Sequence, residues 1–338
     1  MKRPIWMETA NRGKLYGIAF VPACRPRGYL QFVTDLYDTI ERYEAIMDRL
    51  SRRGYLVFGY DFSGHGSHTG ALGNLKGAIS NDLISDLHHQ YQQILREYPP
   101  VIAGETLSHK DGKTLHLISP TLHAMIGIGF GCSLIRAYLL HYADVNTLLM
   151  IGDMCMSSRY TRLLETCQDE RRKRGDHASS QSIREELQKG WRASDGTEGR
   201  NAYRSSDRKR IRSYDRDERL NFEYDLASMQ TILSVLSMVT MSQWLSSFPK
   251  YLPLYEMCGY LDPVSNFTRE TDELLTRFRY SSCRNVFYRY YENCRHDLLL
   301  ESCQREVVSD MKRFIERIDE NLQQTYAAQR EVWINRKE

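Results

Sequence analysis

Three positions in the chain carry residues that could form a catalytic or binding site, and each follows a segment predicted to be a buried strand. One apolar run ends in three glycines spaced two apart, Gly127, Gly129 and Gly131. Far downstream, Asp262 and His296 each follow another such run. A carboxylate and an imidazole can form an acid–base pair, whereas a glycine-rich turn after a strand is also typical of phosphate-binding loops. The glycines alone do not decide between a catalytic acid–base site and a phosphate-binding loop.

An alternation of strands and helices must position these residues. Short β-rich runs predict strands at 14–22, 28–33, 55–61, 122–128, 146–153, 251–260 and 285–291. Apolar stripes predict helices at 41–53, at 132–142, at 268–279 and at the C-terminal end, and a further helix is predicted with its N-terminal cap near Ser80 or Asn81. The segment before 122, which contains SHKDGK, is predicted to be a loop. This order predicts an α/β fold, a mostly parallel sheet with helices on both faces and ligands bound at the carboxyl ends of its strands.

Residues 157–244 interrupt the alternation. The part up to residue 225 is polar and Ser-rich, with 17 Lys and Arg against 14 Asp and Glu, and an apolar helical stretch follows it. We predict a core of residues 1–156 and 245–338 with 157–244 inserted as a helical lid. The basic runs at 171–174 and 208–210 are interpreted as exposed faces of this insertion, and contact with an anionic membrane surface is the alternative.

Composition excludes several classes of protein. The chain has 338 residues, a formal net charge of +3 and no apolar run long enough to span a membrane. The small charge and the lack of a binding motif argue against nucleic acid. Eight cysteines without a CxxC pair predict free thiols, and His65 and His68 lack a third ligand, so no metal site is predicted. The N-terminal residues lack a secretory h-region, which favours a cytoplasmic location.

With these motifs in order, the chain resembles the α/β-hydrolases of the serine aminopeptidase, monoacylglycerol lipase and lysophospholipase group, nearly from end to end. The family's GHG segment matches 54–67, with Ser63 in place of the usual arginine. Its acid motif, G-x-x-DPV, matches 259–264, and its base motif matches 295–297. The resemblance implies that Asp262 and His296 correspond to the acid and base of a catalytic triad, and that the insertion is the lid.

Two family motifs are altered. The nucleophile elbow, G-x-S-x-G, falls on 127–131 with Gly129 at the serine position. A register with Cys132 or Ser133 as the nucleophile is rejected, because the following RAYLLHY matches the family helix only when Gly129 is central. The HG pair of the oxyanion loop falls on Thr34 and Asp35. The resemblance implies that the backbone N–H groups of Leu36 and Phe130 form the oxyanion hole.

These departures argue against ester hydrolysis by a covalent route. Without an oxygen at Gly129 no acyl-enzyme can form, and a space about the size of a CH2OH group is expected beside His296, where a water could sit. Asp35 restricts the loop and repels a developing oxyanion.

Two functional hypotheses follow from this chemistry. In the first, the protein is a degenerate hydrolase that binds an apolar or acyl ligand, or a protein partner, and needs no cofactor. In the second, it is an ester or lipid hydrolase in which the pair of Asp262 and His296 activates water directly. The sequence identifies neither the ligand nor the oligomeric state.

Overall fold

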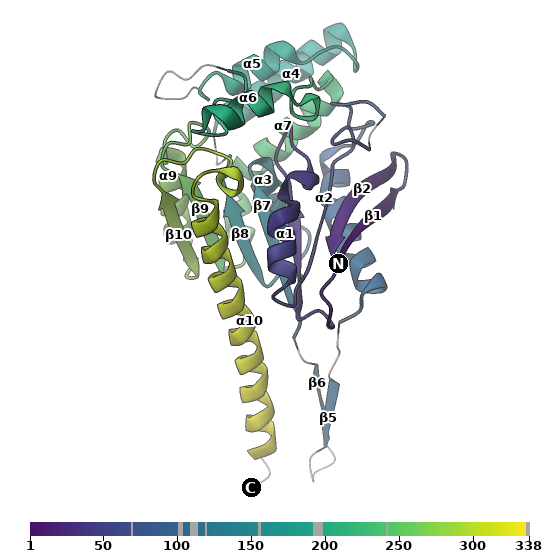
Figure 1. The fold of residues 1–338 in the computed structure, drawn as a ribbon, viewed down its shortest axis with the longest axis vertical. Helices are drawn as coiled ribbons and strands as arrows, with labels where there is room; N and C mark the ends of the chain where they lie inside the picture. Colours follow the sequence, from purple (N-terminus) through teal and green to yellow (C-terminus); the bar gives the residue numbers. More distant parts are fainter. Residues whose placement is uncertain are drawn as a thin grey trace.

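An eight-stranded sheet forms the centre of the protein (Figure 1). The computed structural model describes residues 1–68, 70–100, 104–108, 114–118, 120–154, 157–191, 199–240 and 243–335. In spatial order the strands are β1 (Lys2–Thr9), β2 (Gly13–Phe20), β4 (Leu56–Tyr60), β3 (Gly28–Val33), β7 (Leu122–Ile128), β8 (Thr147–Ile151), β9 (Leu254–Gly259) and β10 (Val286–Tyr291). Strand β2 runs antiparallel to β1 and β4, and the other neighbours are parallel. The predicted α/β sheet is confirmed.

Helices cover both faces of the sheet because its strands are apolar on both sides. In β8, Leu148 and Met150 join a cluster with α3 and α7, whereas Leu149 and Ile151 join a cluster with α1 and α10. Successive side chains of a strand point to opposite faces, so a fully apolar strand needs cover on both. The core helices are α1 (Glu44–Ser51), preceded by the 3-10 helix η1 (Ile40–Tyr43), α2 (Ser80–Glu97), α3 (Phe130–Tyr138), α9 (Arg269–Tyr280) and, after the 3-10 helix η3 (Leu298–Leu300), α10 (Gln304–Asn335).

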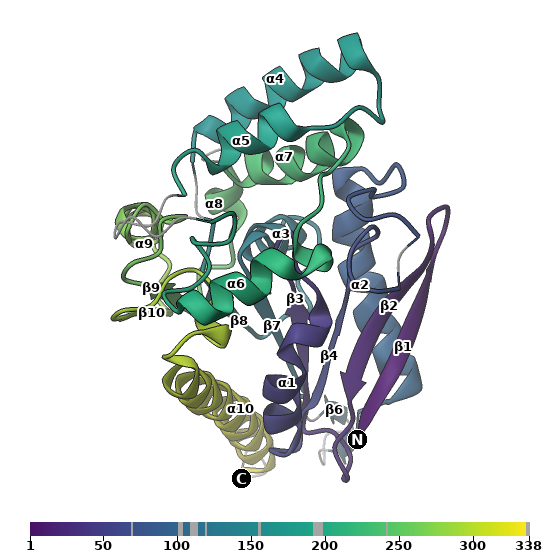
Figure 2. The same cartoon turned by 45° about the horizontal axis from the view of Figure 1, so that its top comes forward.

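The segment between β8 and β9 forms a helical layer over one end of the sheet (Figure 2). Its elements are α4 (Arg159–Arg174), α5 (Gln181–Gln188), α6 (Arg208–Arg216), the 3-10 helix η2 (Glu218–Leu220), α7 (Leu226–Thr240) and α8 (Gln243–Ser247). Helix α7 packs between α3 and α4 and buries its apolar side chains there. The layer is therefore anchored on the core through α7.

The structure corrects several local predictions. Strand β1 was not predicted, and the segment expected to be a loop before residue 122 contains an antiparallel pair, β5 (Gly104–Ser108) and β6 (Thr114–Ile118). Most of SHKDGK lies outside the described residues. Helix α2 begins after Ile79, whose N–H donates to the carboxylate of Asp82 over 2.9 Å, rather than after Ser80 or Asn81.

The prediction that all cysteines are free thiols is wrong for one pair. Cys294 and Cys303 form a disulfide, and their separation of nine residues does not set them apart from other neighbouring cysteines such as Cys283 and Cys294. The remaining described cysteines are free, and Cys155 lies outside the described residues.

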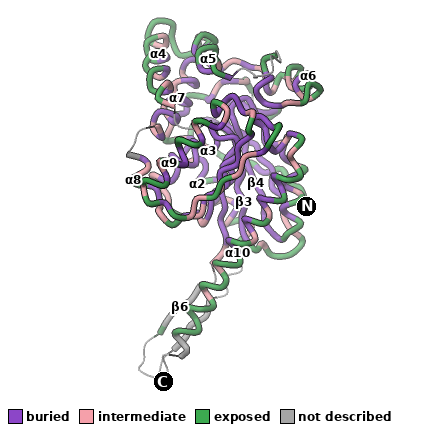
Figure 3. The backbone as a smooth tube through the Cα atoms, turned by 90° about the vertical axis from the view of Figure 1, so that its left-hand side faces the viewer, coloured by how far each residue is buried: buried purple, intermediate pink, exposed green. Residues whose placement is uncertain are grey.

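The last part of α10 leaves the body of the protein and is largely exposed beyond Asp319 (Figure 3). Among the described helices, none is long and apolar enough to cross a membrane.

Candidate active site

A sharp turn joins β7 to α3 at Gly129. Its φ of 53° and ψ of −118° lie in a region that residues with side chains rarely adopt. The Gly129 N–H donates to the carbonyl of Ile151 over 3.0 Å, and its own carbonyl accepts from the Cys132 N–H over 3.1 Å. Position 129 is thereby fixed at the carboxyl edge of the sheet, between β7 and β8.

The flanking glycines have a packing reason that does not depend on catalysis. A Cβ at Gly131 would lie 2.1 Å from the carbonyl oxygen of Val33, and one at Gly127 would lie 2.8 Å from the backbone of Cys132. Both positions therefore require glycine for the close approach of backbones. The elbow keeps its shape although its central residue has no side chain.

Asp262 and His296 meet directly beneath the insertion. Asp262 follows β9, and its Oδ1 accepts from the backbone N–H of Val264 over 2.8 Å. His296 follows β10, and its Nδ1 lies 3.0 Å from Asp262 Oδ2. Both side chains are buried, and the backbone N–H of His296 donates to the carbonyl of Tyr203 over 3.3 Å. The structure thus places the acid and base residues of the sequence motifs in contact.

The carboxylate of Asp35 lies at the elbow. Its Oδ1 accepts from the backbone N–H of Phe130 over 2.7 Å, and its Oδ2 lies 3.4 Å from His296 Nε2. A Cβ built on Gly129 would lie 2.1 Å from Asp35 Oδ1 and 2.2 Å from its Cγ. The expectation of an open space beside His296 is therefore wrong, because Asp35 fills it.

The oxyanion loop is also occupied by groups of this chain. The Phe130 N–H, one of the two donors expected for an oxyanion, is used by Asp35. Leu36, the other expected donor, presents its carbonyl to the guanidinium of Arg204 over 2.9 Å. Thr34 is buried, and within the described part of the chain its hydroxyl oxygen has no hydrogen-bond partner. The loop that would stabilise negative charge instead holds a carboxylate.

His296 is held as a cation between two carboxylates. Burial disfavours the charged imidazole, but Asp262 and then Asp35 outweigh it, so that the pKa of His296 is raised well above its ordinary value. Each ring nitrogen faces a carboxylate oxygen, of Asp262 and of Asp35, and this arrangement favours the protonated imidazole.

Arg204 of the insertion completes this arrangement. Its Nη1 lies 3.1 Å from Asp297 Oδ1 and 3.8 Å from Asp35 Oδ2, and its Nη2 donates to the carbonyls of Leu36 and Tyr37 over 2.9 and 3.1 Å. The Arg204 side chain is completely buried. One guanidinium thus joins the insertion to the oxyanion loop and to the residue after His296.

A second guanidinium lies on the other side of Asp297. Arg42 donates to Asp297 over 2.8 Å and to Asp38 over 2.6 Å, and Asp38 also accepts from the Tyr43 hydroxyl over 2.5 Å. Burial opposes the ionised form of Asp297, but Arg204 and Arg42 outweigh it and hold the pKa of this carboxyl below its ordinary value. The network therefore alternates positive and negative groups through the buried interface.

The peptide around Arg204 is held at several further points. Arg295 donates to the carbonyls of Ala202 and Ser205 over 2.6 and 2.8 Å. Glu301 accepts from the Ser205 hydroxyl over 2.8 Å and from the backbone N–H of Ser206 over 2.7 Å. Residues 202–206, which we call the latch, therefore bind the core through both side-chain and backbone groups.

Sequence reasoning missed the latch. Arg204 lies in a segment so rich in arginine that nothing local distinguishes a buried guanidinium from exposed ones. The exposed runs differ in their partners: Arg172 pairs with Asp169 and Arg174 with Glu170 on the same helix. Among the described residues there is no cluster of His, Cys, Asp or Glu that could hold a metal ion.

The N-terminal part of the core matches a known family. Residues 25–105 match a family model described as "Serine aminopeptidase, S33". No curated protein matches the chain.

Several solved structures share the whole fold. A thermostable carboxyl esterase from Bacillus coagulans in complex with glycerol has 19% identity and a TM-score of 0.80, covering 94% of this chain and 99% of the other. A lipase in an open form has 18% identity and a TM-score of 0.78, covering 94% and 99%. A monoglyceride lipase from Saccharomyces cerevisiae has 15% identity and a TM-score of 0.66, covering 94% and 95%. The chain therefore has the α/β-hydrolase fold.

Proposed function

We propose that this α/β-hydrolase-fold protein has lost hydrolytic activity and acts by binding, while its former catalytic centre holds the insertion closed on the core. The observation that carries the proposal is the position of the Asp35 carboxylate. It lies where a serine side chain at position 129 would project, and it uses the Phe130 N–H that an oxyanion would need. One substitution pair, Gly129 with Asp35, thus removes the nucleophile and fills its place.

Covalent acyl transfer requires an oxygen nucleophile, a base and donors for the oxyanion. Gly129 supplies no nucleophile, and Asp35 brings a negative charge to the point where negative charge would develop. At the low effective dielectric of a buried site, two such charges repel strongly. The retained elbow geometry therefore supports no acyl-enzyme.

Direct activation of water by His296 is not favoured either. A general base needs a ring nitrogen with a free lone pair, close to the water that it deprotonates. Here Nδ1 faces Asp262, Nε2 faces Asp35, and the pKa of His296 is raised. The imidazolium is better understood as a structural cation that holds two carboxylates together.

A ligand of the acyl type expected from the sequence would have to open packed structure in the insertion. Ile232, Leu233 and Leu236 of α7 are buried in the core cluster shared with α3. We therefore propose that the protein binds a ligand or partner without turnover. The latch stays closed during this binding.

The experiment compares native protein with His296→Ala and with Arg208→Ala, a change in the insertion at an exposed arginine. We expect no labelling of the folded protein by a fluorophosphonate probe, and equal background rates on short-chain p-nitrophenyl esters for all three. Circular dichroism checks that each variant is folded. Labelling near the elbow, or a rate lost only in His296→Ala, would show that catalysis persists and would refute the proposal.

A further inference from the structure

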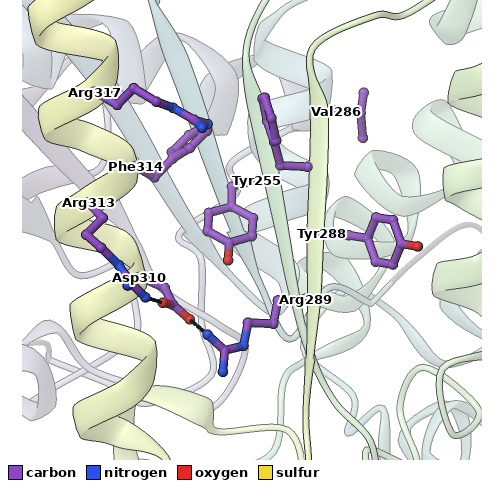
Figure 4. Close-up of a pocket in the computed structure, with 9 residues that line it drawn as sticks. Tyr255, Val286, Tyr288, Arg289, Asp310, Arg313, Phe314 and Arg317 are labelled. Carbon is purple, nitrogen blue, oxygen red and sulfur yellow. Dashed lines mark hydrogen bonds and ion pairs between the residues drawn. The ribbon is translucent and has the colours of Figure 1, made fainter.

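A groove lies on the face of the sheet covered by α10, beside the edge strand β10 (Figure 4). Its volume is about 560 Å³, within the range that binds small organic molecules. Its lining combines the aromatic rings of Tyr255, Phe287 and Phe314 with charged side chains that include Arg289, Asp310 and Arg317. None of these residues belongs to the site around His296 or to the latch.

The charged side chains of the groove are unbalanced. Three arginines and one aspartate line it, so the net formal charge of these side chains is +2. Asp310 is buried and accepts from Arg289 and from the Tyr291 hydroxyl, each over 2.7 Å, and it also pairs with Arg313. The one carboxylate of the lining is thus shared by two of the three guanidinium groups, and Arg289 also pairs with Glu306 outside the lining.

Arg317 is the third guanidinium, and it contacts aromatic rings instead. It lies 4.5 Å from the ring centre of Phe287 and 5.4 Å from that of Phe314. Among the described residues no carboxylate pairs with it. Stacking of this kind uses the faces of the guanidinium, whereas its N–H donors point outward in the plane, where they suit a carboxylate or phosphate. Arg317 therefore has no anionic partner among the described residues, and its donors are free for an anion from outside the chain.

The same groove offers an apolar wall. The rings of Tyr255 and Phe314 lie 5.1 Å apart, and those of Phe287 and Phe314 lie 5.6 Å apart. Phe287 keeps 40% of its surface exposed, and Tyr288, which also lines the groove, keeps 49%. An apolar group of a ligand that covered these rings would be shielded from water and would lie beside the Arg317 guanidinium.

We propose that this groove binds amphipathic organic anions. Arg317, with Arg313 beside it, binds the carboxylate or phosphate, and the rings of Tyr255, Phe287 and Phe314 contact the aliphatic or aromatic body. The proposal goes beyond the loss of hydrolysis and does not depend on it, because the groove is formed by β9, β10 and α10 alone.

Isothermal titration calorimetry on the full chain tests the proposal with four probes: octanoate, octyl phosphate, inorganic phosphate and 1-octanol. We expect saturable one-to-one binding of octanoate, octyl phosphate or both, which identifies the head group. Inorganic phosphate lacks the apolar body and 1-octanol lacks the charge, so each should bind at least about tenfold more weakly. Equal affinity for inorganic phosphate, or no binding of either anion, would overturn the proposal.

Two variants locate the binding. Arg317→Gln should weaken binding of the anions about tenfold or more, whereas Arg305→Gln, the same change at an exposed residue of α10 outside the groove, should leave it unchanged. Phe287→Ala should weaken octyl phosphate while leaving any binding of inorganic phosphate unaffected. An anion that binds Arg317→Gln as tightly as the native chain occupies another site, such as the insertion, and the proposal is then wrong.

Discussion

The site around His296 and the groove beside β10 differ in whether their charged side chains have partners of opposite charge. Around His296, the buried charged groups are joined in one chain of ion pairs that runs from Asp262 through His296 and Asp35 to Arg204, Asp297 and Arg42. In the groove, Arg317 has aromatic neighbours and, in the described structure, no anion. The difference follows the access of water. A buried ion without a partner costs several kcal/mol, whereas an exposed one is solvated and remains free for a ligand.

Residues that match catalytic motifs can be held in a closed set of ion pairs, and the site around His296 is arranged in this way. Asp262 and His296 keep the contact of an acid–base pair, but Asp35 turns His296 into one member of a closed network. The groove carries none of the sequence motifs described above, yet its Arg317 has no anionic partner among the described residues.

Gly129→Ser should cost the most stability. The new Cβ would lie 2.1 Å from Asp35 Oδ1 at a φ of 53°, so we expect a loss of roughly 2–6 kcal/mol, about half from overpacking and half from backbone strain. Asp35→Gly alone has its own cost, because it takes a partner from His296 and from the Phe130 N–H. In the double variant the clash is absent, so its loss should be smaller than the sum of the two single losses. Urea denaturation measures all three variants. Additive losses would contradict the account of Asp35 as the group that fills the elbow.

The same pair of variants tests reactivity. Gly129→Ser alone should restore little or no labelling by a fluorophosphonate, because Asp35 still uses the Phe130 N–H. The double variant should be labelled faster, since both the oxygen and the oxyanion donor are then available. Strong labelling of the single variant would show that Asp35 moves aside easily.

Arg204→Met should destabilise the protein by about 3–5 kcal/mol, because it removes one of the two guanidinium partners of Asp297 and the donor to the carbonyls of Leu36 and Tyr37. The matched control is Arg210→Met in the same insertion, where the arginine is 40% exposed and pairs loosely with Asp207. That change should alter stability by less than about 1 kcal/mol. Urea denaturation and limited proteolysis of the insertion measure the difference. Similar losses in the two variants would rule out a special role for the latch.

The contribution of His296 should depend on pH in a defined direction. Its pKa is raised in the folded protein, so folding binds a proton, and the stability from this proton is fully present below the unfolded pKa of about 6.5. It is lost as the pH rises through the raised folded value. His296→Gln should therefore cost roughly 1–3 kcal/mol at pH 6 and less at pH 9, measured by urea midpoints. A difference that grows with pH would mean that the imidazole is neutral when folded.

Arg317→Gln should have the smallest effect on folding, less than about 1 kcal/mol, because Arg317 is exposed and loses only ring contacts. Thermal denaturation checks this, and Arg204→Met measured in parallel is the reference. A loss as large as that of Arg204→Met would show that Arg317 is a structural residue, and the contrast between the two regions would fail.

Much of the fold was predictable because its signals are local. The run GYLQFV is β3 at the predicted bounds, and LHAMIGI is β7. Their apolar character and bordering glycines suffice to define each strand. Strand β1 was missed because its exposed and charged residues resemble a tail, and it becomes a strand only by pairing with β2 at the edge of the sheet.

The residues of the candidate site also differ in whether they could be predicted from the sequence. Gly129, Asp262 and His296 could be selected from sequence because their motifs are short and ordered along the chain. The role of Asp35 was only partly accessible: its charge argued against an oxyanion, but its position inside the elbow depends on how β3 and β7 bring residues 35 and 129 together. Arg204 was not accessible, because burial of one arginine among many depends on where the insertion packs.

Residue identity and local periodicity were enough to show that position 129 carries no side-chain oxygen and that the chain alternates strands and helices around an α/β sheet. Three other features emerged only from the folded chain: Asp35 lies beside Gly129, His296 lies between Asp35 and Asp262, and Arg317 has no anion beside it among the described residues. Each of those depends on which charges meet in space and how far water is excluded from them.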